Sequence, residues 1–419
     1  RPDIVSIIQR DVTKAVLKAY PSIEKDEDDD LMDILLKAFM ETGERFVLII
    51  DEWDALCREA TDKPEMMNDY VNLLRRLFKG GDTGRVFACV YMTGILPIKQ
   101  YGTQSALNDF KEFSMTNPRQ LAGHIGFTTE EVKKLCTKYD MDFDMMKGWY
   151  DGYSFGHEYP SVFNPNSVMI ACQGHACGNY WARTSAFEAL QQYIDINFDN
   201  VKEALEKILM GERMVVSTLR FNFDIKTIGN CEELLNLFIH LGYLAYNVEE
   251  AAVSIPNKEI RMEFNEAIRG SKSHKELAAI IKMSDELLEA TLTRHEDKVA
   301  QLIEQIHNHQ AGPNFYNNEQ ALRSVVKMGY LSAIDRFVTI QELPTGKGYA
   351  DMVFIPRRNI GKEAMVVELK WNKAVKTALD QIKERQYPDI LKGFTDNILL
   401  VGITYNENTK QHTCKIEQI

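Results

Sequence analysis

Hydrophobic and polar positions form two kinds of pattern in the first part of the chain. Residues 31–42 and 66–81 carry apolar side chains at helical spacing. Between and after them lie a continuous apolar run, 46–50, and a second, mainly apolar stretch, 85–95. A continuous apolar run is typical of a parallel strand that is buried on both faces. The order of strand, helix and strand therefore predicts an α/β domain with a parallel sheet.

The middle of the chain is predicted to be mainly helical. From about residue 128 to 195 the pattern has helical spacing, and Thr128 with Glu131 forms a capping-box arrangement. Residues 200–268 mix short helices with strand-like pieces, which favours a winged-helix-like module, and residues 274–310 are strongly helical. Such a module can bind DNA, but its acidic surroundings favour a packing role.

Charged residues interrupt two apolar strands near the C-terminus. The stretch GYADMVFIPRRNIGKEAMVVELKW, residues 348–371, predicts two strands joined by a polar turn. Because side chains alternate faces along a strand, Glu368 and Lys370 share one face with Val366. The opposite face would be the packing face. A hairpin between the two strands would bring Asp351 near Glu368.

These three residue types suit metal-dependent hydrolysis of a phosphodiester. Carboxylate oxygens such as those of Asp351 and Glu368 bind a hard divalent cation, so Mg²⁺ or Mn²⁺ is the expected metal. The metal would activate water and stabilise the negative charge of the transition state. Lys370 would position or deprotonate the attacking water. An exposed strand face with alternating charges would give the same letters without any catalytic role.

The C-terminal block resembles the PD-(D/E)XK nuclease superfamily, in which an aspartate and a hairpin precede Glu-x-Lys. The segment NNEQALRSVVKMGYL resembles the first helix of that fold, and Glu319 matches an acidic residue often found there. The segment ALDQIKERQY resembles the helix after the catalytic strand, with Gln381 and Tyr387 at polar positions of the site. The resemblance implies a restriction-endonuclease-like α/β domain. Glu319 could also be a surface partner of Arg323, one helical turn away.

A second acidic motif follows the first apolar run. In VLIIDEWDAL, Asp51 and Glu52 take the form of a Walker B motif, in which the first acid holds Mg²⁺ and the second orients water. Thr93 stands where many AAA-type ATPases carry a polar sensor residue. An acid at the end of a buried strand is also common without such a role. The pattern G-x-x-x-x-G-K-[ST] is absent from the chain, so these residues are expected to bind ATP poorly.

The whole chain resembles a widespread bacterial family that joins an AAA-ATPase-like domain to a C-terminal PD-(D/E)XK nuclease domain. The segments that carry this resemblance are VLIIDEWDAL, MTGILPIKQYGTQSALNDF, WYDGYSFG, LGYLAY, SIPNKEIR and the C-terminal block. In that family the phosphate-binding loop precedes the Walker B strand by many tens of residues. The resemblance therefore implies that the loop lies upstream of Arg1, and that the full-length protein binds ATP.

The resemblance implies a multidomain α/β protein with four divisions. The expected divisions are a truncated AAA-ATPase-like core over 1–127, a helical lid-like region over 128–199, a winged-helix-like and helical connector over 200–310, and a nuclease-like domain over 311–419. The predicted function is an ATPase-coupled, Mg²⁺-dependent nuclease. The alternative is a nucleotide-switched regulatory protein whose nuclease-like domain is catalytically silent.

Three features of the composition add to this picture. The net charge of the chain is −12, but residues 311–419 hold 15 Lys and Arg against 12 Asp and Glu. This local excess suits DNA or RNA as the partner of the C-terminal domain. The seven cysteines are scattered and form no C-x-x-C, which favours free thiols in a cytoplasmic protein. No apolar run approaches a membrane span, so no membrane partner is expected, whereas a homo-oligomer is left open.

Overall fold

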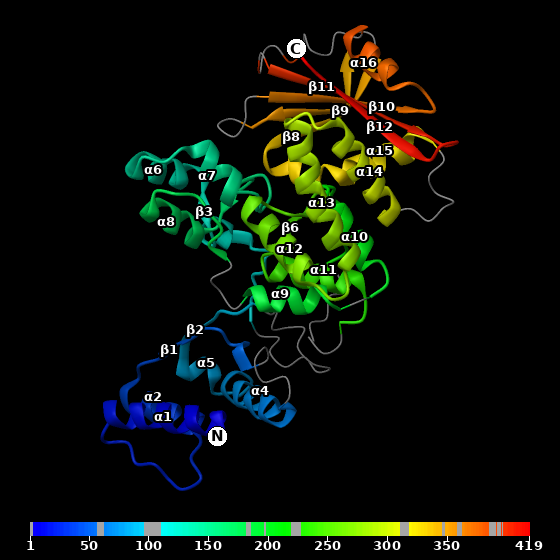
Figure 1. The fold of residues 1–419 in the computed structure, drawn as a ribbon. Helices are drawn as coiled ribbons and strands as arrows, with labels where there is room; N and C mark the ends of the chain where they lie inside the picture. The colour runs from blue at the N-terminus through cyan, green and yellow to red at the C-terminus, as the bar shows by residue number, and fades with distance from the viewer. Residues whose placement is uncertain are drawn as a thin grey trace. The chain divides into compact units, whose positions relative to one another are not determined.

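A computed structural model gives the fold of the chain (Figure 1). The residues that it describes are 3–56, 63–95, 110–181, 186–196, 198–218, 228–310, 318–345, 348–357, 363–384, 391, 395 and 397–419. The chain divides into two compact units. One contains residues 1–121 and 216–244, and the other contains residues 122–215 and 245–419.

The first unit combines short helices with a parallel pair of strands. Its described elements are α1 (Ile4–Ala19), α2 (Leu31–Thr42), β1 (Phe46–Ile50), α4 (Pro64–Phe78), α5 (Thr83–Val86), β2 (Phe87–Met92) and α11 (Cys231–His240). The predicted helix over 31–42 is confirmed, and Gly43 ends it in the left-handed conformation at a φ of 70°. Strands β1 and β2 are parallel, as the order of strand, helix and strand predicted.

The expectation that these strands are buried on both faces is wrong. Side chains of Val47, Ile49 and Tyr91 are 63%, 67% and 53% exposed. On the opposite face, the ring of Phe46 packs against that of Tyr20, with 6.2 Å between the ring centroids. Within the described residues the sheet consists of β1 and β2 alone, and packing covers one of its faces. The apolar run therefore did not show that the strand is buried, because burial depends on what covers each face.

The second unit begins with short helices and small antiparallel sheets. The 3-10 helix η2 (Arg119–His124) spans the sequence boundary between the two units. The other described elements of this unit up to residue 310 are β3 (Phe127–Thr128), α6 (Thr129–Tyr139), α7 (Phe143–Tyr150), β4 (Val162–Phe163), α8 (Pro165–Gly174), α9 (Ala186–Ile194), α10 (Val201–Leu209), β5 (Met214–Val215), β6 (Ala245–Asn247), β7 (Ala252–Ser254), α12 (Lys258–Gly270), α13 (Lys275–Leu292) and α14 (Glu296–Gln310). The predicted capping box of Thr128 and Glu131 is confirmed at the start of α6. Strands β5, β7 and β6 pair antiparallel in that order.

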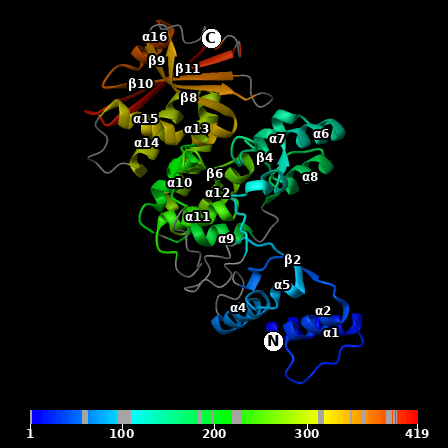
Figure 2. The ribbon, with the colours of Figure 1, turned by 180° about the vertical axis from the view of Figure 1, so that it is seen from behind.

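A larger sheet forms the C-terminal part of this unit (Figures 1 and 2). Its elements are α15 (Glu319–Gly329), η5 (Leu331–Asp335), β8 (Phe337–Thr345), β9 (Gly348–Pro356), β10 (Glu363–Trp371), α16 (Val375–Glu384), β11 (Asn397–Asn406) and β12 (Gln411–Gln418). The described strands lie in the order β12-β11-β10-β9-β8. Strands β10 and β11 are parallel, and the other neighbours are antiparallel. The predicted hairpin of β9 and β10 is therefore confirmed.

Helices cover both faces of this sheet. Figures 1 and 2 show α16 on one face and α13, α14 and α15 on the other. On the α16 side, Val353 and Val366 pack with Leu379 in one buried cluster. On the α15 side, the ring of Phe354 lies 5.2 Å from that of Tyr330. The expectation of a single packing face on β10 is therefore wrong, because the face that carries Glu368 and Lys370 is also covered by a helix.

Two further expectations concern the cysteines and membrane-spanning segments. The six cysteines among the described residues are free thiols, as predicted. None of the described helices is both long and apolar enough to cross a lipid bilayer.

Candidate active site

Asp351 and Glu368 lie on the same face of the C-terminal sheet. Strands β9 and β10 pair Val353 with Val366 and Met352 with Val367. Continuing this antiparallel register by one residue brings Asp351 opposite Glu368. Residues in that relation have Cβ atoms about 4.5–5.5 Å apart and point to the same face. The period of two in the sequence thus located both carboxylates on one face, and the structure brings them together.

Glu368 is the centre of a buried polar cluster. Its side chain is 1% exposed, and its Oε1 accepts a hydrogen bond from Nζ of Lys370 at 3.0 Å. Lys370 is also buried, and its Nζ donates to the main-chain oxygen of Leu369 at 2.9 Å. Nε2 of Gln381, on α16, donates to the same Oε1 of Glu368. The structure therefore joins three of the residues singled out in the sequence.

Asp351 is held by two donors from different elements. Its Oδ1 forms an ion pair with Arg323 of α15, and its Oδ2 accepts the main-chain N–H of Leu369 at 2.8 Å. The Asp351 side chain is 8% exposed, so this carboxylate depends on its partners for stabilisation. Arg323 was expected only as a surface partner of Glu319. A pattern of residues i and i+4 on a helix cannot show that one of them reaches a strand instead.

A glycine beside Glu368 allows α16 to approach the sheet. Glu368 is paired with Gly402 of the parallel strand β11. A Cβ atom at Gly402 would lie 3.2 Å from Cβ of Ala378 and 3.3 Å from the main-chain oxygen of Val375. Both of these residues belong to α16, which also carries Gln381. The small residue in β11 therefore helps to bring Gln381 within reach of Glu368.

Of the two other residues predicted for this site, the structure describes only Glu319, which stands apart from the cluster. Glu319 is the first residue of α15 and is half-buried, one helical turn before Arg323. In the part of the chain that the structure describes, Glu319 makes no hydrogen bond or ion pair with Asp351, Glu368, Lys370 or Gln381. Tyr387 lies outside the described residues.

The donor set fits a hard divalent cation. Two carboxylates from opposed strands present oxygen atoms on one face, beside the main-chain oxygen of Leu369. Among the described residues no group of three or more His, Cys, Asp or Glu could hold a metal. Two carboxylates are nevertheless sufficient for Mg²⁺, which usually keeps several waters and shares its remaining positions with a substrate phosphate. A cation here would compete with Arg323 and Lys370 for the carboxylates.

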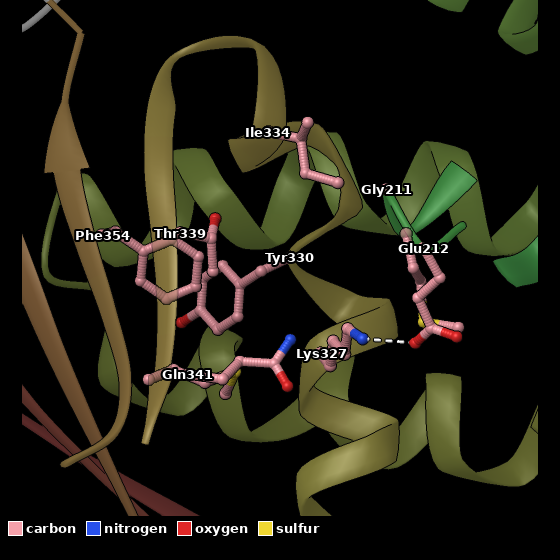
Figure 3. Close-up of a pocket in the computed structure, with 10 residues that line it drawn as sticks. Gly211, Glu212, Lys327, Tyr330, Ile334, Thr339, Gln341 and Phe354 are labelled. Atoms are coloured by element: carbon pink, nitrogen blue, oxygen red, sulfur yellow. Dashed lines mark hydrogen bonds and ion pairs between the residues drawn. The ribbon is translucent and has the colours of Figure 1, made fainter. Parts of the chain in front are cut away.

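A small cavity lies behind the sheet, on the α15 side (Figure 3). Its volume is about 210 Å³, and Met352, the neighbour of Asp351, lines it. Lys327 of α15 forms an ion pair with Glu212 at its wall, as Figure 3 shows. Lys327 lies one helical turn after Arg323. One turn of α15 therefore contacts the carboxylate site, and the next turn contacts this cavity.

The acidic motif of the first unit also comes together. Strands β1 and β2 end side by side, and Oγ1 of Thr93 donates to Oδ1 of Asp51. The main-chain N–H of Glu52 donates to Oγ1 of the same threonine at 3.2 Å. Asp51 and Glu52 are exposed, and Glu52 has a positive φ of 51°, which is uncommon for a residue other than glycine. The three residues predicted for nucleotide chemistry therefore lie at one edge of the sheet.

A buried aspartate next to this motif was not anticipated. Asp54 is fully buried, and its Oδ2 accepts the main-chain N–H of Ile95 at 3.1 Å. A Cβ atom at Gly94 would lie 2.4 Å from Cδ1 of Trp53, so glycine is required at that crossing. These contacts fix the loop after β1 against the end of β2, and thereby fix Asp51 and Thr93 relative to each other.

Comparisons with known proteins agree with this arrangement. A family model described as a predicted AAA-ATPase matches residues 3–103, and one described as the PD-(D/E)XK nuclease superfamily matches residues 317–415. A protein of Azotobacter chroococcum mcd 1, described as an uncharacterized protein in the vnfD 5' region, is 22% identical over 398 residues. That match covers 90% of this chain and 72% of the relative. No solved structure matches the chain.

The C-terminal sheet and its opposed carboxylates thus define a nuclease-type domain of the PD-(D/E)XK superfamily. The chain joins this domain to an N-terminal AAA-ATPase-like segment, which is the architecture of the family that its motifs resemble.

Proposed function

We propose that the C-terminal domain hydrolyses phosphodiester bonds of nucleic acid with the help of Mg²⁺ or Mn²⁺. The observation that carries the proposal is the position of Glu368, which lies opposite Asp351 and accepts hydrogen bonds from Lys370 and Gln381. Burying charged side chains costs free energy, so such a cluster in the interior points to a functional role. The match of residues 317–415 to a nuclease superfamily supports the same reading.

The proposal gives each side chain a role. Asp351 and Glu368 would hold the metal through their carboxylate oxygens. Such a metal, when bound, supplies Lewis-acid stabilisation of the phosphate oxygens and lowers the pKa of bound water. Lys370 would orient the attacking water and offset negative charge at the phosphate. Gln381 would fix the rotamer of Glu368, and Glu319 would support the site from the first turn of α15.

The AAA-ATPase-like segment is proposed to regulate this activity through nucleotide. Asp51 would hold Mg²⁺, Glu52 would orient water, and Thr93 would sense the nucleotide phosphate. The contact of Thr93 with Asp51 supports a joint role for these residues. The sequence supplies the acids of such a site without the G-x-x-x-x-G-K-[ST] loop, so ATP is a proposed cofactor of the full-length protein.

The test is cleavage of labelled single-stranded and double-stranded DNA and RNA by the purified chain. Reactions should contain Mg²⁺, Mn²⁺ or EDTA. Cleavage is expected with either metal and should stop with EDTA. Glu368→Gln and Lys370→Met are each expected to reduce the rate by about 10²–10⁴-fold. Lys383→Met, which changes an exposed lysine of α16, is the matched control and should cleave like the wild type.

The variants need a stability measurement because both side chains are buried. Lys370 is 5% exposed, so its removal leaves the charge of Glu368 with one donor fewer in the interior. The combined variant Glu368→Gln, Lys370→Met removes both charges and is expected to unfold at a higher temperature than Lys370→Met alone. A folded Lys370→Met protein that cleaves at the wild-type rate would contradict the proposal. Absence of cleavage by the wild type would favour a catalytically silent domain in a regulatory protein.

A further inference from the structure

A larger cavity lies away from the carboxylates, where two sequence motifs meet. Its volume is about 620 Å³. Its walls come from α7, from the segment before α12, from η5 and from the ends of β8 and β9. The motifs are WYDGYSFG and SIPNKEIR, which carry the family resemblance and have no role in the proposed hydrolysis.

Main-chain contacts fix these two motifs against each other. Gly152 has a φ of 112°, and a Cβ atom there would lie 2.0 Å from the main-chain oxygen of Pro256. Nδ2 of Asn257 donates to the main-chain oxygen of Asp151 at 2.8 Å. Oδ1 of Asn257 also caps α12 by accepting the N–H of Ile260 at 3.0 Å. The wall of the cavity is therefore built before any ligand arrives.

Three cationic side chains line this cavity from three different elements. Lys147 belongs to α7, Lys258 begins α12, and Arg357 follows β9. Lys147 and Arg357 are exposed, and Lys258 is half-buried. A fourth cation, Arg261, is committed to the fold, because it donates to the main-chain oxygen of Leu209 at 2.8 Å and lies 3.4 Å from Asp335. The three outer cations are positioned to meet an anion.

Three acidic side chains at the cavity offset part of this charge and leave an excess of one positive charge. Oδ1 of Asp151 accepts hydrogen bonds from Oγ of Ser161 at 2.7 Å and from the N–H of Gly152 at 2.6 Å. Asp335 is the ion-pair partner of Arg261. Asp144 is the third acid and is an exposed residue of α7. The lining therefore holds four cationic side chains and three carboxylates, and Asp151 keeps its negative charge because its hydrogen-bond donors are neutral.

An aromatic ring stands beside the cations. Trp149 is half-buried and lines the cavity, and Nζ of Lys258 lies 4.4 Å from the centroid of its ring. Single-stranded nucleic acid is typically bound by this combination, with bases stacked on aromatic side chains and phosphates near Lys or Arg. An apolar wall that includes Ile355 and Val338 completes the surface on which a base could pack.

We propose that this cavity binds an unstacked nucleotide within a single-stranded stretch of the nucleic acid that the domain acts on. Trp149 would stack on the base, and Lys258, Arg357 and Lys147 would contact the neighbouring phosphates. The choice of ligand rests on the proposed function. A recess of this size can admit an extruded base, whereas paired bases within a duplex remain stacked.

The position of the cavity suits a strand that also reaches the carboxylates. The end of β9 lines the cavity, and Asp351 belongs to the same strand. Pro356 lies five positions after Asp351, which corresponds to about 17 Å of extended strand. One single-stranded segment of several nucleotides can therefore occupy both places. The cavity would hold the strand while the phosphodiester lies at the carboxylates.

Binding should be measured apart from cleavage. The Glu368→Gln protein, in EDTA, is titrated into fluorescein-labelled 12-nucleotide single strands of DNA and RNA and into the matching blunt duplex. Anisotropy is recorded at several salt concentrations. On this background, Trp149→Leu removes the stacking ring and Trp149→Phe retains one. Lys258→Gln and Arg357→Gln each remove a proposed phosphate contact. Lys133→Gln, which changes an exposed lysine of α6 that does not line the cavity, is the control.

Trp149→Leu is expected to weaken single-strand binding about tenfold or more, while Trp149→Phe stays close to the parent protein. Lys258→Gln and Arg357→Gln should each reduce the slope of log affinity against log salt by about 0.7. Lys133→Gln should change neither quantity. Duplex should bind more weakly than single strands. Equal binding by the parent protein and Trp149→Leu, at matched melting temperature, would overturn the inference. So would a free mononucleotide that binds as tightly as the 12-nucleotide strand.

The two proposals can fail separately. If the wild type cleaves and the Glu368→Gln protein binds strands independently of Trp149, Lys258 and Arg357, the cavity inference is wrong and the nuclease proposal stands. If the wild type does not cleave but binding still depends on Trp149, the nuclease proposal is wrong and the cavity remains a nucleic-acid site. Competition by polyglutamate as strong as that by unlabelled strand would overturn the cavity inference, since it would show general attraction of polyanions.

Discussion

Arg323 of α15 forms an ion pair with Asp351 of β9, and the same carboxylate accepts the main-chain N–H of Leu369 at 2.8 Å. The second candidate carboxylate, Glu368, accepts a hydrogen bond from Lys370. Each proposed metal ligand therefore has a cationic partner from this chain. Metal binding at Asp351 must displace Arg323 or share the carboxylate with it, so the ion pair and the metal are competitors.

Replacing Arg323 should make the protein more dependent on metal. With Arg323→Met, the buried carboxylate of Asp351 loses its ion pair but keeps the N–H of Leu369. The loss of stability in EDTA should approach the ~3–5 kcal/mol that is typical of a broken buried pair. Added Mn²⁺ or Mg²⁺ should raise the melting temperature of Arg323→Met more than that of the wild type. Calorimetric titration should show tighter metal binding.

Two matched variants separate charge from general damage. Arg323→Lys keeps a cation near Asp351 and should lie between the wild type and Arg323→Met. Arg336→Met removes the surface pair with Glu289, which should cost about 0–1 kcal/mol and leave the metal response unchanged. A metal-induced shift in Arg323→Met that does not exceed that of the wild type would show that Arg323 and the metal do not compete.

Gly402 should tolerate only a small side chain. Its β11 position is paired with Glu368, and a Cβ atom there would lie 3.2 Å from Cβ of Ala378. Gly402→Ala requires a shift of a few tenths of an ångström, whereas Gly402→Leu must push α16 from the sheet. We expect Gly402→Leu to lower the free energy of unfolding by about 1–3 kcal/mol. Cleavage should fall beyond the loss of folded protein, because Gln381 would move away from Glu368.

Urea unfolding and cleavage measured on the same Gly402 samples test this expectation. Gly174→Leu is the control, since a Cβ atom at Gly174 has no atom within 4 Å. If Gly402→Leu is as stable and as active as the wild type, α16 does not depend on a close approach at this point.

His412 should make stability fall in acid. Its side chain is buried between the rings of Tyr405 at 4.7 Å and His307 at 5.4 Å. Burial, and next the neighbouring His307, lowers the pKa of His412 to about 3, whereas an unfolded histidine has a pKa of about 6.5. The unfolded state therefore binds a proton that the folded state does not accept. The stability from His412 is complete above about pH 6.5 and is lost as the pH falls toward 3.

His412→Phe should remove this part of the pH dependence. One such histidine contributes a slope of up to about 1.4 kcal/mol per pH unit between the two pKa values. Urea unfolding of the wild type and of His412→Phe at pH 7, 6 and 5 measures the slopes. His157→Gln is the control because its side chain is 94% exposed, and its slope should equal that of the wild type. Equal slopes in His412→Phe and the wild type would show that another group accounts for acid destabilisation.

Local patterns predicted much of the C-terminal domain. The period of two placed Glu368 and Lys370 on one face of β10, and the antiparallel hairpin located Asp351 opposite Glu368. Capping residues also marked helix starts, as at Thr128. These features depend on neighbours in the sequence or across one turn, so they can be read from the residues themselves.

The remaining features depend on contacts between distant segments. The sequence suggested Glu319 as a residue of the site, with a surface pair to Arg323 as the alternative, but the structure pairs Arg323 with Asp351 of another element. It suggested that only the opposite face of β10 packs, but α16 covers the face that carries Glu368, which is 1% exposed. It suggested full burial of β1, but Ile49 is 67% exposed. Hydrophobic patterns show which faces can pack, whereas tertiary structure decides what covers them.

The acids at the end of β1 lead to the last prediction, which concerns nucleotide. Asp51, Glu52 and Thr93 lie together at the edge of a parallel sheet, where an AAA-type ATPase would hold Mg²⁺ and water. The chain contains no G-x-x-x-x-G-K-[ST] loop. In P-loop ATPases the amides and lysine of that loop cradle the phosphates, while the acids mainly place metal and water.

We therefore expect calorimetric titration of ATP with Mg²⁺ into this chain to give no saturable binding, and phosphate release to stay at background. Without the loop, the carboxylates of Asp51 and Glu52 repel a triphosphate more than they hold it. Asp51→Asn serves as the comparison, since it removes one of the two negative charges and keeps the shape. Saturable binding by the wild type that Asp51→Asn abolishes would show that these acids hold nucleotide by themselves. Binding that persists in Asp51→Asn would locate a nucleotide site elsewhere in the chain, and either result would contradict the prediction.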